Sequence, residues 1–256
     1  MISDKKVCFL VSSAISTDYG EEIERGLETI NTVNSINAQF PNSVIILIES
    51  GKGQFASYFV NHFPKNVRII QFWDDPNIEI LRKQAKEYGE NMVKEHTFGS
   101  NTKAQPLLEL CYIKSATESY TFRHVFDRLN FQEFDYVFKL SGRYSLSSAF
   151  NMDKWYHKNK IVFRESVPTN QSGMHVPRQY TCFIWGFCPS VIDEVRRVYT
   201  DLNTYIIQEL QSLKIMDMEH GLYHCLDPKH VVALSRETEE PWGVYAKMGG
   251  KRHFLI

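Results

Sequence analysis

The sequence has no excess of charge and no long apolar run, and each absence excludes a class of protein. Its 256 residues carry 29 Lys and Arg against 30 Asp and Glu, which is a formal net charge of -1. No overall positive field is therefore available to hold nucleic acid. No stretch approaches the roughly 20 apolar residues that cross a bilayer. We expect no nucleic-acid partner and no transmembrane segment.

Cysteine is also scarce, and its pattern excludes a disulfide scaffold. The five cysteines are odd in number and include no C-x-x-C pair, which favours a reducing compartment. Lys5 and Lys6 precede an apolar run, Val7 to Val11, that is too short for a signal peptide. We therefore expect a cytoplasmic location.

Four catalytic signatures are missing. The chain has no G-x-G-x-x-G after its first apolar run, no G-x-x-x-x-G-K-[ST], no G-x-S-x-G and no H-E-x-x-H. Dehydrogenase, P-loop, serine-hydrolase and zinc-protease functions consequently have no motif to support them.

Short apolar runs alternate with amphipathic segments along the chain. The runs at 6–11, 44–48 and 67–72 are typical of strands buried on both faces. Between the first two, apolar residues recur at spacings of four and three, which predicts an amphipathic helix over 19–38 with the stripe Ile23, Leu27, Ile30, Val33 and Ile36. Strand, helix and strand in this order indicate an α/β fold.

The same criteria predict the rest of the fold. We expect helices over 78–94, 106–129, 189–213 and 217–226, and strands over 136–140, 161–163, 182–187 and 230–234. Residues 166–180 lack periodicity and are predicted to form a loop over a site. No repeat or linker divides the chain, so we predict one domain over 1–256, with 236–256 as a closing tail.

In open α/β sheets a ligand lies beyond the carboxyl ends of the strands. One strand end there carries two cations and a glycine in the hexapeptide Lys139-Leu-Ser-Gly-Arg-Tyr144. Such cations are often surface charges whose stems cover apolar neighbours. The hexapeptide resembles the K-[ILV]-[ST]-G-R-Y signature of the glycosyltransferase-like proteins of bacterial and viral polysaccharide synthesis. The resemblance extends, more weakly, over most of residues 5 to 235, including Arg25 and Thr29, the segment 47–50, and the segments 182–187 and 218–223.

The resemblance implies a GT-A-type fold, with a mixed, mostly parallel sheet flanked by helices, that binds a nucleotide-diphospho-sugar. Many relatives keep a D-x-D metal motif where the hexapeptide stands, yet no two of the 11 aspartates here are separated by one residue. The negative charge of the leaving diphosphate must then be met by cations or amides. Arginine suits this task because its planar fork matches phosphate oxygens.

We therefore predict that the donor is bound by Arg143 with help from Lys139 or from the terminal cations, beside small residues at two strand ends. The full predicted donor set is Arg143, Lys139, Ser12, Ser13, Ser141, Gly142, Lys251 and Arg252. Lys251 and Arg252 also fit a solvated basic tail. No cofactor is required by this scheme. Mn²⁺ or Mg²⁺ is the alternative, with Asp74, Asp75 and Asp217 as ligands. The Asp-Pro sequence at Asp74 and Asp75, however, favours a simple turn there.

An acceptor hydroxyl needs a base, and two carboxylates open the helix predicted over 217–226. We assign the catalytic role to Glu219 or Asp217 and favour Glu219, since Asp217 also fits a helix N-cap. His220 and His224, four residues apart, are a weak signal for zinc.

The sequence thus predicts an inverting, metal-independent glycosyltransferase that moves a sugar from a nucleotide-sugar donor to a glycan hydroxyl. Two alternatives stay open. One is a non-catalytic nucleotide- or carbohydrate-binding module, which the missing D-x-D favours. The other is a sugar nucleotidyltransferase, against which the first strand end, Ser12 to Ser16, lacks a Gly-rich, Lys-bearing loop.

Overall fold

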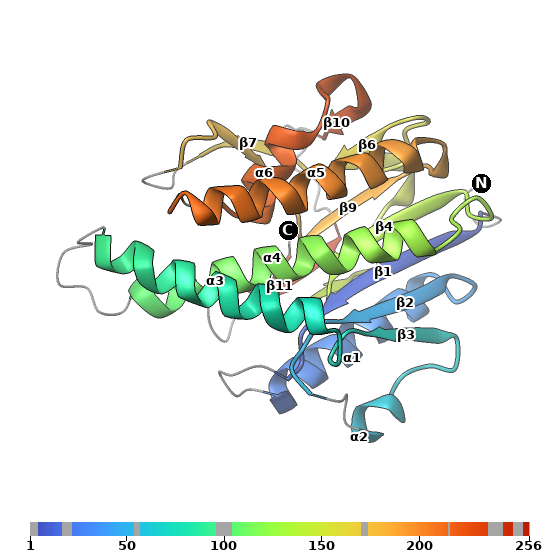
Figure 1. Ribbon diagram of the computed structural model, residues 1–256. Helices are drawn as coiled ribbons and strands as arrows, with labels where there is room; N and C mark the ends of the chain where they lie inside the picture. Colours follow the sequence, from blue (N-terminus) through green and yellow to red (C-terminus); the bar gives the residue numbers. More distant parts are fainter. Residues whose placement is uncertain are drawn as a thin grey trace.

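A seven-stranded mixed sheet runs through the middle of the molecule (Figure 1). The computed structural model describes residues 5–16, 22–53, 57–95, 104–169, 174–214, 216–234, 243–247 and 253–255. The strand order is β10-β6-β9-β4-β1-β2-β3, in which β9 alone runs antiparallel to its neighbours. In chain order the strands are β1 (Val7–Ser13), β2 (Val44–Glu49), β3 (Val67–Gln71), β4 (Tyr136–Ser141), β6 (Ile161–Phe163), β9 (Ile184–Phe187) and β10 (Val231–Ala233).

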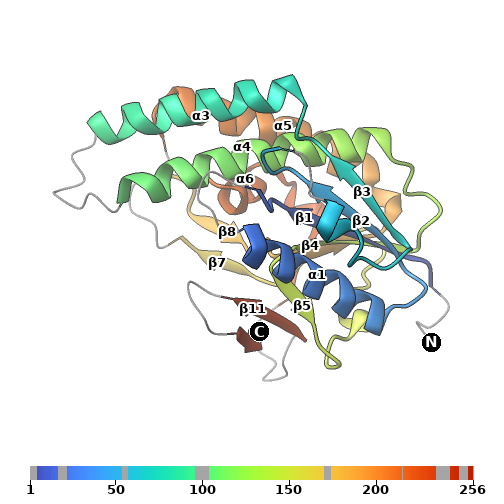
Figure 2. The same ribbon diagram turned by 90° about the horizontal axis from the view of Figure 1, so that it is seen from below.

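Helices cover both faces of this sheet. Figure 2 shows long helices on one side and α1 (Glu22–Gln39) on the other. The long helices are α3 (Pro76–Glu95), α4 (Ala104–Arg128) and α5 (Ile192–Gln211), and the short α6 (Met218–Cys225) packs on α5. α2 (Ser57–Val60) is a single turn. The described residues also include the 3-10 turns η2 (Met152–Lys154), η3 (Pro189–Val191) and η4 (Pro228–His230). The mostly parallel α/β architecture predicted from the sequence is confirmed.

Strand β1 illustrates why apolar and polar residues do not alternate along the central strands. Cys8 and Leu10 belong to the apolar cluster beneath α3, α4 and α5, whereas Val7, Phe9 and Val11 belong to the cluster beneath α1. Both faces of the strand are therefore removed from water, as in other sheets covered by helices on two sides.

The predicted stripe of α1 is wrong in its first half. Ile23 and Leu27 are 72% and 51% exposed, while Gly26 and Thr29 are buried. Here the helix turns small and polar side chains inward, because Thr29 hydrogen-bonds Ser13 at the end of β1. Apolar periodicity alone does not reveal such a contact.

Two small β-structures were missed by the sequence analysis. β5 (Tyr144–Leu146), β11 (Val244–Lys247) and β12 (His253–Leu255) form a three-stranded antiparallel sheet, so 230–234 is not the last strand. The segment expected to be an irregular loop holds a hairpin of β7 (Ser166–Pro168) and β8 (Arg178–Tyr180). Strands of three or four residues are too short to show a period of two.

None of the described helices is long and apolar enough to cross a membrane.

Candidate active site

Two adjoining cavities open at one edge of the large sheet. The first lies beyond the carboxyl ends of β1, β2 and β4, where Ser13, Ser50 and Ser141 line it, and has a volume of about 180 Å³. The second measures about 130 Å³ and shares part of its wall with the first. The residues common to both are Lys114, Glu118, Ser141 and Arg143. A cavity therefore lies beyond the strand ends at which the sequence analysis expected a ligand.

A buried carboxylate shapes the loops around the first cavity. Oε1 of Glu49 accepts hydrogen bonds from the backbone N–H of Ile15 at 3.0 Å and of Gly51 at 2.7 Å. A Cβ at Gly51 would lie 2.4 Å from that oxygen, so the loop needs glycine there. Burial raises the pKa of Glu49, although these hydrogen bonds oppose the shift. Glu49 thus holds the loops after β1 and β2 together.

Close backbone contact joins the ends of β1 and β4. Gly142 N–H donates to the carbonyl of Ser12 at 2.7 Å. A Cβ on Gly142 would lie 2.8 Å from that carbonyl oxygen and 3.2 Å from Oγ1 of Thr29. Ser13 and Thr29 hydroxyls lie 3.3 Å apart. The glycine of the hexapeptide is therefore required by this close approach, which brings Ser12, Ser13 and Ser141 to one cavity wall.

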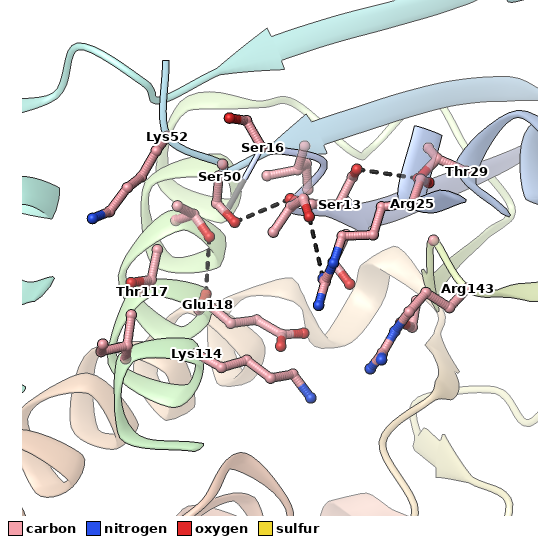
Figure 3. Close-up of a pocket in the computed structure, with 18 of the residues that line it drawn as sticks. Ser13, Ser16, Arg25, Thr29, Ser50, Lys52, Lys114, Thr117, Glu118 and Arg143 are labelled. Carbon is pink, nitrogen blue, oxygen red and sulfur yellow. Dashed lines mark hydrogen bonds between the residues drawn. The ribbon is translucent and has the colours of Figure 1, made fainter. Parts of the chain in front are cut away.

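Cations dominate the charge of the first cavity. Among the described residues, five cations line it: Arg25, Lys52, Arg82, Lys114 and Arg143. Arg25 donates to the carbonyl of Ala14 at 3.3 Å, and Arg82 donates to the carbonyl of Ser50. Figure 3 shows Arg25, Lys114 and Arg143 pointing into the same open space, from α1, α4 and the end of β4 respectively. Arg143 is exposed and, within the described part of the chain, makes no ion pair.

Lys139, the charged residue inside the apolar strand β4, is buried and paired. Its Nζ lies 2.7 Å from Oε1 of Glu118 and donates to the carbonyl of Cys182 at 3.1 Å. Burial opposes ionisation of Glu118, but the charges of Lys139 and Lys114 outweigh it and lower the pKa of Glu118. Lys139 lines the second cavity and not the first. Glu118 therefore neutralises the charge of Lys139. Arg143 lines the first cavity, whereas Lys139 does not.

Glu219 lines the second cavity, at the first turn of α6. Burial raises the pKa of Glu219, and the charges of Asp217 and Glu118 add to the rise while Lys114 opposes it. A carboxyl group with a raised pKa takes up a proton more readily than a carboxyl group in water. Glu219, which the sequence analysis favoured as the base, therefore lies in surroundings that favour its protonated form.

Asp217 caps the helix that carries Glu219. Its Oδ1 accepts the backbone N–H of His220 at 2.9 Å and lies 2.7 Å from Nδ1 of the same residue. The other ring nitrogen of His220 lies 2.9 Å from Oγ1 of Thr169, at the end of β7. His220 is completely buried, whereas His224 stacks on Tyr205 with ring centroids 4.2 Å apart. The two histidines therefore have separate structural partners.

The charge of the described residues that line the first cavity opposes the binding of a divalent metal. Among the described residues, five cationic side chains line the first cavity, and the one carboxylate in its wall, Glu118, is already paired with Lys139. A further cation would be repelled in such a place. Among the residues that the structure describes, no three His, Cys, Asp or Glu side chains form a group that could hold a metal ion. Asp75 instead accepts hydrogen bonds from Asn77 N–H and Tyr120 at the start of α3, which is the turn favoured above.

The structure brings most of the predicted site residues to these two cavities. Lys251 and Arg252 lie outside the described residues, as does most of the predicted closing tail, 236–256. Sequence reasoning missed Lys52, Arg82, Lys114 and Glu118 as site residues. Lys114 and Glu118 are four residues apart, which places both on one face of α4. This spacing is the feature of the sequence from which the two could have been predicted to lie in one site.

Comparison with known proteins shows likeness in structure only. No protein-family model and no curated protein sequence matches the chain. Core-mannan synthase A from Aspergillus fumigatus, in a Mn/GDP form, is similar over 88% of this chain and 72% of its own, with a TM-score of 0.52 and 9% identity. The mannosyltransferase Ktr4p from S. cerevisiae, in complex with GDP, is similar over 88% of this chain and 66% of its own, with a TM-score of 0.53 and 11% identity.

Identities this low carry information about the fold and not about the substrate. The order and direction of the strands, the helices on both sheet faces and the likeness to these two transferases agree with one another. The chain therefore has the mixed α/β fold of GT-A-type glycosyltransferases.

Proposed function

We propose that this protein is a glycosyltransferase that moves a sugar from a nucleotide-diphospho-sugar to a glycan hydroxyl, with inversion and without a metal ion. One observation carries the proposal: a cavity lined by cations adjoins a second cavity that holds the carboxylate of Glu219, and Arg143 lines both. Transfer of a sugar from a diphosphate needs these two kinds of group side by side.

The donor occupies the first cavity. Its diphosphate lies against Arg143, Arg25 and Lys114, whose side chains point into one space (Figure 3). The hydroxyls of Ser12 and Ser13 lie near the nucleotide, and Ser141 and Gly142 complete the wall. A charge pair at about 4 Å contributes about 1 kcal/mol in water and several times that in a closed site, so three cations can replace a metal ion. The GDP held by the two mannosyltransferases of like fold supports the choice of a nucleotide donor.

The acceptor enters the second cavity, where Glu219 acts as the base. Glu219 takes the proton of the acceptor hydroxyl while that oxygen attacks the anomeric carbon. The bond from the anomeric carbon to the diphosphate oxygen breaks, and its electron pair leaves on the diphosphate, where the cations stabilise it. Asp217 acts through α6: its capping contacts hold the first helical turn, and so Glu219, in place.

Thermal shifts test the donor site. The purified protein is heated with UDP-, GDP-, CMP- and dTDP-sugars, in EDTA and with Mn²⁺. We expect one nucleotide family to raise the melting temperature in EDTA, because a ligand that binds only the folded state stabilises it by mass action. Arg143→Gln should abolish the shift. Arg68→Gln, the same change at an exposed position of β3, should retain it. A shift that requires Mn²⁺ would contradict the metal-independent scheme.

Turnover tests the assignment of the base. Glu219→Gln should lose transfer and slow donor hydrolysis while it keeps the donor-induced thermal shift. Near-normal turnover in this variant would show that another group is the base. A wild-type protein that binds donor yet never hydrolyses or transfers it would instead be a non-catalytic binding module. The anomeric configuration of the product reports inversion directly.

A further inference from the structure

The second cavity changes character away from the wall that it shares with the first. Beyond Lys114, Glu118, Ser141 and Arg143, it is lined by aromatic, amide and hydroxyl side chains, which include Tyr144, Phe183, Gln179 and Thr181. Lys139 is neutralised by Glu118, which leaves Glu219 as the charged group of this part. A phosphate group is therefore better matched by the first cavity. The second cavity offers aromatic, amide and hydroxyl side chains to a ligand.

Tyr144 is held in that wall by contacts of its ring and of its backbone. Its ring stacks on Phe183, with centroids 5.0 Å apart and ring planes within 9°. The guanidinium carbon of Arg164 lies 5.4 Å from the centroid of Phe183. The backbone is fixed as well, because Ser141 N–H donates to the carbonyl of Phe183 at 2.9 Å and β5 pairs with β11 at Tyr144. A flat ring fixed by several contacts loses little freedom when a ligand lies against it.

The geometry points to a binding site for an uncharged pyranoside acceptor, packed by its C–H face against Tyr144 with its hydroxyls toward Gln179, Thr181 and Glu219. This inference rests on the proposed function and names its acceptor class. A pyranose ring has an apolar face and a polar rim, and a site with an aromatic surface and a few polar groups matches both. A uronic acid would bring a second carboxylate toward Glu219. We expect this repulsion to outweigh the attraction by Lys114 and Arg143, which lie on the wall shared with the first cavity and face the donor diphosphate there.

Binding of simple sugars tests the inference without turnover. Neutral methyl pyranosides of the gluco, galacto, manno and 6-deoxy series, and a methyl glucuronide, are titrated by saturation-transfer NMR, with and without nucleoside diphosphate. At least one neutral glycoside should bind, and the glucuronide should bind at least about tenfold more weakly. Tyr144→Ala and Tyr144→Leu should weaken the neutral ligand by at least about tenfold, whereas Tyr144→Phe should stay within about twofold.

The matched control is Tyr245→Ala, which removes an exposed tyrosine from the neighbouring strand β11 and should leave binding unchanged. The inference is overturned if no neutral glycoside binds, if the glucuronide binds as well as the neutral sugars, or if both Tyr144→Ala and Tyr144→Leu retain wild-type affinity. Donor-induced thermal shifts on the same samples separate this from the proposed function. A normal donor shift with unaltered glycoside binding overturns the inference alone, and an absent donor shift in the wild type counts against the proposed function.

Discussion

Nζ of Lys139 lies 2.7 Å from Oε1 of Glu118, and this ion pair joins β4 to α4 at the second cavity. The two side chains are 5% and 11% exposed. Lys139 also donates to the carbonyl of Cys182, so its charge is surrounded by acceptors. A charge placed inside an apolar strand is tolerated because its partner lies on the helix that covers the strand.

Removal of one partner should destabilise the fold strongly. Lys139→Met or Glu118→Gln leaves an unpaired buried charge, and each should cost about 3–5 kcal/mol. The double variant should be less destabilised than the sum of the two single variants, because both charges are gone. Urea unfolding of the four proteins gives the coupling energy. Strictly additive losses would mean that the pair contributes nothing as a pair.

The same pair should make stability depend on acid pH. Burial opposes the charge of Glu118, but Lys139 and Lys114 prevail and hold its pKa below the usual value of 4.5. A carboxyl group with a lowered pKa in the folded state stabilises the protein above 4.5, and that contribution is lost as the pH falls through the lower folded pKa. Compared with the wild type, Glu118→Gln should show a shallower loss of unfolding free energy below pH 4.5. Parallel curves for the two proteins would refute this.

Protonation of Glu219 should determine how kcat falls at low pH. Burial raises its pKa above the usual 4.5, and the base must be ionised to accept a proton. Under saturating donor, kcat should therefore fall as the pH drops through a midpoint above 4.5. Lys114 lowers the pKa of Glu219, so Lys114→Met should move that midpoint to higher pH. An unchanged midpoint in Lys114→Met would show that Lys114 does not affect the pKa of the group that controls kcat.

How much of the fold and of the site can be predicted from the sequence depends on how far apart in the chain the contacting residues are. The long strands and helices follow from local periodicity, as the match of 78–94 to α3 and 136–140 to β4 illustrates. The end of β4 was predicted to bind the donor because Lys139, Gly142 and Arg143 stand close together in the chain, in a hexapeptide that resembles a family signature. Both inferences need only neighbouring residues.

Contacts between distant segments were not predictable in this way. Arg82 and Lys114 approach the cavity from helices whose positions are set by packing on the sheet. The pairing of Lys139 with Glu118, 21 positions earlier, has no local signal, although an uncompensated lysine in a buried strand does demand a partner. The contact of the buried Thr29 with Ser13, 16 positions earlier, likewise has no local signal.

Gly142→Ala should be costly although the change is one methyl group. The added Cβ would lie 2.8 Å from the carbonyl oxygen of Ser12, so the ends of β1 and β4 would have to separate. We expect a loss of about 1–3 kcal/mol in unfolding free energy and a weaker donor-induced thermal shift. Ser148→Ala at an exposed site should change stability by less than about 0.5 kcal/mol. If Gly142→Ala were as stable as the wild type, the ends of β1 and β4 would accommodate the added methyl group without a steric clash.

Two substitutions at Asp217 distinguish capping from proton transfer. Asp217→Asn keeps an oxygen that can accept the N–H of His220, so helix α6 and Glu219 should stay in place, and kcat should remain within about tenfold of wild type. Asp217→Ala removes the acceptor; it should lower stability by about 1–2 kcal/mol and reduce kcat further, because the first turn of α6 loosens. If Asp217 were itself the base, Asn would abolish turnover as completely as Ala does, without the loss of stability. Melting temperature and kcat, measured on both variants beside Glu219→Gln, decide between these roles, since a base and a cap respond differently to an uncharged isostere.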